Sequence, residues 1–285
     1  MRLDQHLHKL FPNFSRALIQ KLIKSGHVKV NGAVLTKTGQ TLKGTEKVEA
    51  DFNLETNTDQ TLELPIIYED DGCVVLNKPA GVLTHSKGAY NPEPTVATWL
   101  ATRKGYAFKD ESEDMRAGIV HRLDRATSGV MICAKNPNAL KHLQKQFQDR
   151  KAKKTYIARV QDRVRPEKAI IDLPIERNPK QPQRFRVGAN GKPAITAYET
   201  LEYIEDKKIG IDSLLELKPT TGRTHQLRVH MHYLKHPIVG DTFYDGRKAR
   251  RLYLHAHLLE ITLPSKERVT FEAPMPNDFV EASTQ

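Results

Sequence analysis

The sequence contains little cysteine and no long apolar segment. Cys73 and Cys133 are the two cysteines among its 285 residues, and each lies in an apolar run. Two such residues provide neither a disulfide framework nor a cysteine-based zinc site, and this usage is typical of a reducing cytoplasm. No window approaches the roughly 18 apolar residues of a membrane span, and the N-terminus does not resemble a signal peptide. We therefore expect a soluble, cytoplasmic and monomeric protein with no membrane partner.

The motifs of several cofactor-dependent reactions are also absent. The sequence has no phosphate-binding G-x-x-x-x-G-K-[ST] loop, no dinucleotide-binding G-x-G-x-x-G segment and no zinc deaminase signature. His225, His230 and His232 lie close together, but no acidic or cysteine partner stands at ligand spacing, so we expect no metal site there. A reaction that needs no cofactor or metal and uses one carboxylate is what remains.

Positive charge is abundant and is concentrated in blocks. The net charge is +11 and the isoelectric point is near 9.5. Residues 1–52, 140–168 and 218–255 carry net charges of +5, +7 and +6, whereas residues 53–79 carry −5. Such blocks favour a polyanionic partner such as a nucleic acid. The alternative is a charged surface that serves only solubility.

The first 52 residues predict a small basic unit. Apolar residues recur at helical spacing over residues 13–25, where Ser15 is suited to cap the start and Gly26 to end the helix. A short strand follows, and Asn31 and Gly32 after it form the dipeptide most typical of a tight hairpin turn.

This unit resembles the α-L RNA-binding motif of ribosomal proteins and RNA-modifying enzymes. The resemblance implies that the unit docks on RNA, and we name Arg16 and Lys21 as candidate RNA contacts. The alternative is a small α+β fragment whose lysines are merely solvated. The resemblance is carried by Arg16, Ile23, Gly26, Val28, Val30, Asn31 and Gly32.

A polar stretch over 53–64 reads as a linker, and residues 65–285 form a second, larger domain. Strands outnumber helices there, and they do not alternate with helices in regular βαβ order. We therefore predict an α+β fold with a mixed, mostly antiparallel sheet. The apolar patterns predict helices over 137–151 and 224–234, and strands over 65–70, 73–78, 129–135, 153–160, 194–204 and 213–218.

The sharpest candidate for chemistry is Asp124, which lies between Arg122 and Arg125 in the segment 120–129. Neighbouring positive charge favours the ionised carboxylate. Taken alone, however, an aspartate between arginines is more often an exposed ion pair than a catalyst.

Two further segments combine cations with groups suited to RNA. Gly222 leads into the predicted helix over 224–234, with Arg223 at its start and Arg228 further along, so a basic helix end is expected to face an anion. Tyr156 lies on a predicted strand beside Lys154, and aromatic rings next to cations are common in RNA sites. The alternatives are a basic surface helix and a tyrosine packed in the sheet.

Three segments in order resemble the signature segments of the RluA-type pseudouridine synthases. These are NKPAGVLTH (77–85), HRLDRATSGVMICAK (121–135) and TGRTHQLRVH (221–230). Residues 240–246 and 251–264 also resemble the C-terminal part of that family, so the similarity spans nearly the whole chain. It implies the pseudouridine synthase fold and an enzyme that isomerises uridines in RNA without a cofactor.

The resemblance also implies a role for individual residues. Asp124 matches the essential aspartate that attacks the target nucleoside, and Tyr156 matches the tyrosine that lies against the base and takes the proton from carbon 5. Arg223 matches the arginine that pairs with the aspartate. Arg122 matches a residue that enters the RNA where the flipped base had been, and we place Arg125 with it among the RNA-binding residues.

Some alternatives stay open at this point. Leu227 stands where isoleucine is frequent, which affects packing and not the reaction class. The sequence does not decide whether Asp124 attacks the sugar or the base. Ribosomal RNA is favoured over transfer RNA, because family members with the extra N-terminal unit usually act there. The competing hypotheses are a non-catalytic RNA-binding or ribosome-assembly factor and a glycosidase that releases uracil.

Overall fold

The computed structural model describes residues 1–12, 14–51, 62–85, 93–103, 105–108, 118–206 and 210–280. These ranges include every candidate site residue. Most of the predicted linker over 53–64 lies outside them, since only residues 62–64 are described.

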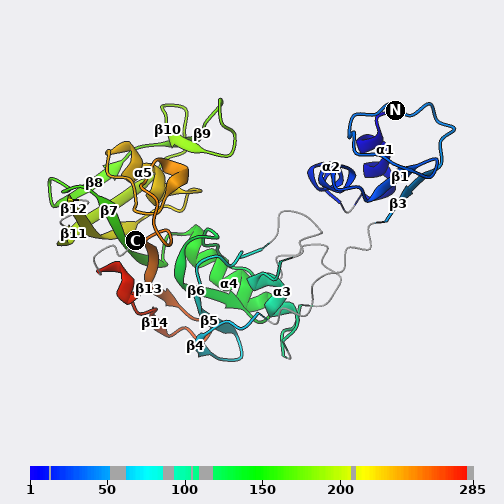
Figure 1. Ribbon diagram of the computed structural model, residues 1–285. Coiled ribbons are helices and arrows are strands. Elements are labelled where there is room, and N and C mark those ends of the chain that lie inside the picture. Colours follow the sequence, from blue (N-terminus) through cyan, green and yellow to red (C-terminus); the bar gives the residue numbers. More distant parts are fainter. Residues whose placement is uncertain are drawn as a thin grey trace.

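The N-terminal residues form a unit with its own hydrophobic core (Figure 1). The Ser15 hydroxyl caps α2 by accepting a hydrogen bond from the amide of Leu18, at 3.3 Å. Asn31 and Gly32 both have positive φ, 51° and 82°, so the predicted hairpin turn and helix are confirmed. The three strands pair in the order β2-β1-β3. The elements are α1 (Leu3–Leu10), α2 (Arg16–Lys24), β1 (Val28–Val30), β2 (Ala33–Val34) and β3 (Val48–Ala50).

A buried carboxylate ties the two helices of this unit together. The Asp4 side chain is fully buried and accepts hydrogen bonds from Arg2, Arg16 and Gln20, the last at 2.7 Å. The bond from Arg2 holds the pKa of Asp4 well below its usual range; burial opposes this shift, and Gln20 and Arg16 add to it. Arg16 therefore joins α2 to α1.

The larger part of the chain is built on one nine-stranded sheet, in the order β4-β5-β6-β13-β7-β12-β11-β8, with β14 beside β13 (Figure 1). Its pairs are antiparallel except for the parallel pair β6–β13. The predicted mixed, mostly antiparallel α+β fold is confirmed. The strands are β4 (Ile66–Glu69), β5 (Cys73–Lys78), β6 (Ser128–Ala134), β7 (Lys153–Gln161), β8 (Lys168–Asp172), β11 (Ile195–Asp206), β12 (Gly210–Pro219), β13 (Leu254–Thr262) and β14 (Arg268–Glu272).

The helices and short elements of this part border the sheet. Asn136 caps α4 and Pro137 occupies its first turn, as expected, but the helix ends at 148 and not at 151. The strands β9 and β10 form a separate hairpin that packs against α5. The elements are α3 (Val96–Ala101), α4 (Pro137–Gln148), β9 (Ile175–Arg177), β10 (Phe185–Val187), α5 (Gln226–Tyr233), and the 3-10 turns η1 (Thr242–Tyr244) and η2 (Asn277–Phe279).

The helix α5 begins two residues later than predicted. His225 precedes it in a left-handed conformation, with φ of 57°. The Gln226 side chain holds the preceding turn, because its Oε1 accepts from the Thr221 hydroxyl at 2.7 Å and from the Arg223 amide at 3.0 Å. Arg223 therefore belongs to the turn before the helix.

A glycine lets β6 and β13 approach each other directly after the segment that carries Asp124. Gly129 has φ of 117°, and a Cβ there would lie 2.1 Å from the carbonyl oxygen of Ala256. Only glycine fits this contact. The close approach fixes where the segment 121–128 joins the sheet.

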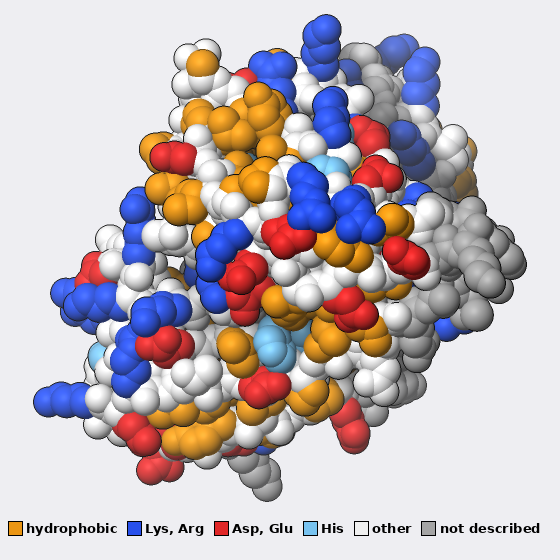
Figure 2. Space-filling model, turned by 90° about the vertical axis from the view of Figure 1, so that its left-hand side faces the viewer, with side chains coloured by type: hydrophobic (Ala, Val, Ile, Leu, Met, Phe, Trp, Pro, Cys, Tyr) orange, Lys and Arg blue, Asp and Glu red, His pale blue; other side chains and the backbone are white. Residues whose placement is uncertain are grey.

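Basic and acidic side chains are interspersed over the face of the molecule shown in Figure 2, so the positive charge does not form one patch there. Within the described ranges, none of the helices has the length and apolarity that a membrane crossing requires.

Candidate active site

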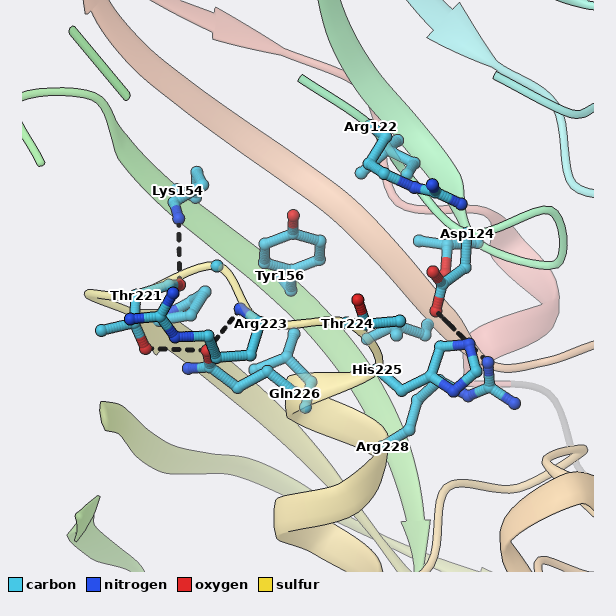
Figure 3. A pocket seen from close by; sticks show the side chains of 16 residues that line it. Arg122, Asp124, Lys154, Tyr156, Thr221, Arg223, Thr224, His225, Gln226 and Arg228 are labelled. Carbon is cyan, nitrogen blue, oxygen red and sulfur yellow. Dashed lines mark hydrogen bonds and ion pairs between the residues drawn. The ribbon is translucent and has the colours of Figure 1, made fainter. Parts of the chain in front are cut away.

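Two of the three signature segments, 121–135 and 221–230, meet at a pocket of about 130 Å³. Its wall comes from the segment before β6, from the start of β7 and from the turn that leads into α5, with Leu254 of β13 completing it. Asp124, Tyr156, Arg122 and Arg223 all line this pocket (Figure 3). Residues separated by about 100 positions in the sequence are thus brought together.

Asp124 is held by an arginine that is itself fixed by a second carboxylate. Nη1 of Arg228 donates to Oδ2 of Asp124 at 3.2 Å. Nε and Nη2 of Arg228 donate to the two oxygens of the buried Asp241, at 2.7 and 2.8 Å. Burial alone would lower the pKa of Arg228, but Asp241 and Asp124 more than offset this effect and raise it. Arg228 is therefore a permanently charged and rigidly placed partner of Asp124.

The prediction that Arg223 pairs with Asp124 is wrong. Nε of Arg223 donates to the carbonyl oxygen of Pro193 at 3.0 Å, and Figure 3 shows Arg223 beside Thr221, away from Asp124. Arg223 lies in the turn before α5, whereas Arg228 lies within the helix and faces Asp124. The segment 221–230 contains two arginines, and the sequence alone does not show which of them contacts Asp124.

Tyr156 lies in the middle of the pocket, between Lys154 and Asp124 (Figure 3). Burial raises the pKa of its hydroxyl, and the negative charge of Asp124 raises it further. The hydroxyl therefore keeps its proton in the free protein. The ring offers a flat apolar surface against which a base fits.

His225 also borders Asp124 and was not among the predicted site residues. Its Nε2 lies 3.7 Å from Oδ2 of Asp124, and a hydrogen bond of 2.8 Å joins its Nδ1 to the Tyr244 hydroxyl. Burial lowers the pKa of His225, while Asp124 opposes this shift. A neutral imidazole at neutral pH follows, so Arg228 supplies the positive charge beside Asp124.

Lys154 is a second residue that the sequence placed near the site without a defined role. Its Nζ donates to the carbonyl oxygen of Thr221 at 3.2 Å, and burial lowers its pKa to about 8. This lysine stands on the opposite side of Tyr156 from Asp124 (Figure 3).

The first signature segment supports the one that carries Asp124. Nζ of the buried Lys78 donates to the carbonyl oxygens of Pro79 and Val82 at 2.9 Å each, and to that of Arg125 at 3.4 Å. Burial lowers the pKa of Lys78 to about 8, against the effect of Asp124. The Thr84 hydroxyl donates to the carbonyl oxygen of Leu123 at 2.9 Å. The residues on both sides of Asp124 are thereby fixed.

The candidate RNA-binding residues differ in whether their side chains are already engaged by other groups of the protein. Arg122 is exposed and lines the pocket, and Lys21 is exposed on α2. Arg125, by contrast, donates to the carbonyl oxygen of Gly81 at 2.9 Å and pairs with Glu93 at 2.8 Å. Arg16 is bound to Asp4.

Residues 72–233 match the family model for RNA pseudouridylate synthase. The chain belongs to the RNA pseudouridylate synthase family. Residues 1–48 match the S4 domain model, and the predicted family and enzyme class are confirmed. The N-terminal RNA-binding unit that the α-L resemblance implied is this S4 domain.

Relatives and a solved structure agree with this assignment. A protein of Haemophilus ducreyi named ribosomal large subunit pseudouridine synthase D is 36% identical, covering 98% of this chain and 89% of its own. An uncharacterized RNA pseudouridine synthase of Aquifex aeolicus is 40% identical, covering 87% and 78%. The structure of human RNA pseudouridylate synthase domain containing 1 has a TM-score of 0.60 and 29% identity, covering 74% of this chain and 83% of its own.

Proposed function

We propose that this enzyme isomerises uridines of large-subunit ribosomal RNA to pseudouridine, with Asp124 as the nucleophile. The observation that carries the proposal is the pocket in which the Asp124 carboxylate is held by Arg228 next to Tyr156, in a chain of the pseudouridylate synthase family. The name of the Haemophilus ducreyi relative, which this chain matches over 98% of its length, supports ribosomal RNA of the large subunit.

The reaction exchanges one bond of the nucleoside for another. The bond between C1′ and N1 breaks, a bond between C1′ and C5 forms, C5 loses a proton and N1 gains one. A stacked uridine is out of reach of Asp124, so the base first leaves the helix, and the exposed Arg122 at the pocket mouth fills the gap. Attack by the Asp124 carboxylate then splits the exchange into two easier steps through a covalent intermediate.

Arg228 keeps the nucleophile ionised and aimed. Two of its donor groups are committed to Asp241, so the remaining Nη1 has one position from which to contact Asp124. Tyr156 provides the wall against which the detached uracil turns, and we assign to its oxygen the proton of carbon 5. Formation of the covalent intermediate removes the negative charge of Asp124, which is one of the two causes that raise the pKa of Tyr156. Loss of the Tyr156 hydroxyl proton therefore becomes easier after the attack. That proton passes to N1 of the uracil, and the phenolate oxygen that remains takes the proton of carbon 5.

The proposal is tested by tritium release from RNA labelled at carbon 5 of uridine. Unmodified transcripts of large-subunit ribosomal RNA, small-subunit ribosomal RNA and transfer RNA are incubated separately with the wild-type protein. We expect stoichiometric release from the large-subunit transcript alone. Release from transfer RNA alone would overturn the substrate, and release of free uracil in place of pseudouridine would show a glycosidase.

A further inference from the structure

A second and larger cavity adjoins the active-site pocket. Its volume is about 500 Å³, within the range of ligand-binding sites, and it shares the side chains of Arg122, Lys154, Tyr156 and Arg223 with the smaller pocket. Where it extends beyond that pocket, its wall includes Phe147 and Arg150, at the end of α4. The side chains that line it include no aspartate or glutamate.

Four cations line this cavity, which we call the basic cleft: Arg122, Arg150, Lys154 and Arg223. In the part of the chain that the structure describes, none of them has a carboxylate within 4.0 Å, whereas Arg103, Arg125 and Arg186 each pair with a glutamate. Lys154 and Arg223 donate instead to the carbonyl oxygens of Thr221 and Pro193. Carbonyl oxygens fix a cation without neutralising it, so the cleft keeps its positive potential.

Arg150 occupies this wall at a conformational cost. It follows the end of α4 with φ of 57°, a left-handed conformation in which glycine is preferred. A glycine would therefore relax the backbone while removing the guanidinium. The structure thus offers a substitution that separates the charge of Arg150 from the stability of the fold.

We propose that the basic cleft binds a phosphate group of the RNA strand beside the target uridine. This inference rests on the proposed function, since the strand enters the cleft from a nucleotide whose base occupies the adjoining pocket. A phosphodiester carries one permanent negative charge and accepts charge-assisted hydrogen bonds from Arg and Lys. Arg223, which is not the partner of Asp124, acts in this cleft as an RNA contact.

The test uses the full chain and an unmodified transcript of large-subunit ribosomal RNA. Dissociation constants are measured between about 0.05 and 0.3 M salt for the wild type, for Arg150→Gly and for Lys141→Ala. The last variant removes an exposed charge from α4 outside the cleft. For Arg150→Gly we expect binding weaker by roughly five- to tenfold near 0.1 M salt and a slope of log K against log salt smaller by about 0.7–0.9. Its melting temperature should equal or exceed that of the wild type.

An Arg150→Gly variant that binds RNA like the wild type, or a Lys141→Ala variant that loses as much affinity as Arg150→Gly, would overturn the phosphate site. An Arg150→Gly variant that binds free inorganic phosphate more weakly than the wild type, but RNA equally tightly, would overturn it as well. Binding is measured apart from turnover. A wild type that binds the transcript but forms no pseudouridine would therefore contradict the proposed function and leave the phosphate site standing.

Discussion

The geometry of Arg228 explains how one carboxylate in the pocket stays charged and aimed. Guanidinium is planar and has five donors in a fixed fork, and here both oxygens of Asp241 and one oxygen of Asp124 are served by one side chain. A buried charge that loses its partner is costly, so Asp241 and Arg228 hold each other in place. Asp124 receives a directed hydrogen bond from this fixed pair.

Replacing Arg228 by lysine should therefore keep the positive charge but no longer hold the Asp124 carboxylate in position. A lysine ammonium cannot reproduce the two-point contact with Asp241 and still reach Asp124. We expect kcat to fall by about a hundredfold in Arg228→Lys, the size of effect that misplacement of a catalytic group by about 1 Å produces. The measurement is single-turnover tritium release at saturating RNA.

The matched control is Arg223→Lys, at the arginine that the sequence favoured. Its contact with the Pro193 carbonyl and its place in the basic cleft predict a raised KM and a kcat within about threefold of the wild type. A kcat that falls more in Arg223→Lys than in Arg228→Lys would contradict the assignment of the aspartate's partner.

The sequence located Asp124 and Tyr156, because the family resemblance implied a role for each of them. The error at Arg223 arose because the segment 221–230 contains two arginines. The turn that the Gln226 side chain holds before α5 directs Arg223 away from Asp124, and this turn depends on tertiary contacts. His225 is itself the residue in a left-handed conformation before the helix. No periodicity of apolar residues reports such a conformation.

Among the elements, the long and strongly apolar ones were predictable. The strands β5, β6, β7 and β12 and the helix α4 were expected close to their observed bounds. The helices α1 and α3 and seven strands were not assigned bounds. Strands β9 and β10 have three residues each, and β8 is an edge strand with an exposed Ile170, so their patterns are weak. The unassigned strands are β2, β3, β8, β9, β10, β13 and β14.

The helix pair of the S4 domain provides a prediction about pH. Because the folded-state pKa of Asp4 is depressed, its contribution to stability is complete above the unfolded pKa of about 3.9 and is lost as pH falls below it. We expect Asp4→Asn to lower protection of the α1 and α2 amides from hydrogen exchange by at least about tenfold near pH 7. The difference from the wild type should shrink toward pH 3. A difference that is independent of pH would contradict the role of the ionised Asp4.

At the scale of the whole molecule, RNA contacts are expected from two parts of the chain, the S4 domain and the catalytic part built on the large sheet. Each part has its own hydrophobic core. The basic blocks predicted this division, although the composition did not show which cations are already neutralised. Arg16 and Arg125 are bound to carboxylates, whereas Lys21 has no carboxylate within 4.0 Å among the described residues.

The two RNA contacts should act independently. Lys21→Ala is expected to weaken binding of the large-subunit transcript severalfold, and combining it with Arg150→Gly should multiply the two losses, because distant sites without shared partners are additive. Salt titrations of the single and double variants measure this. A double variant that binds no more weakly than either single variant would show that the two residues do not contact the same bound RNA.

The most direct test of the central claim is single-turnover tritium release by Asp124→Asn, a substitution that keeps the shape of the side chain and removes its charge. RNA affinity is measured on the same preparation. We predict unchanged affinity to within about threefold and a rate lower by at least about a thousandfold. Wild-type tritium release by Asp124→Asn would contradict the account.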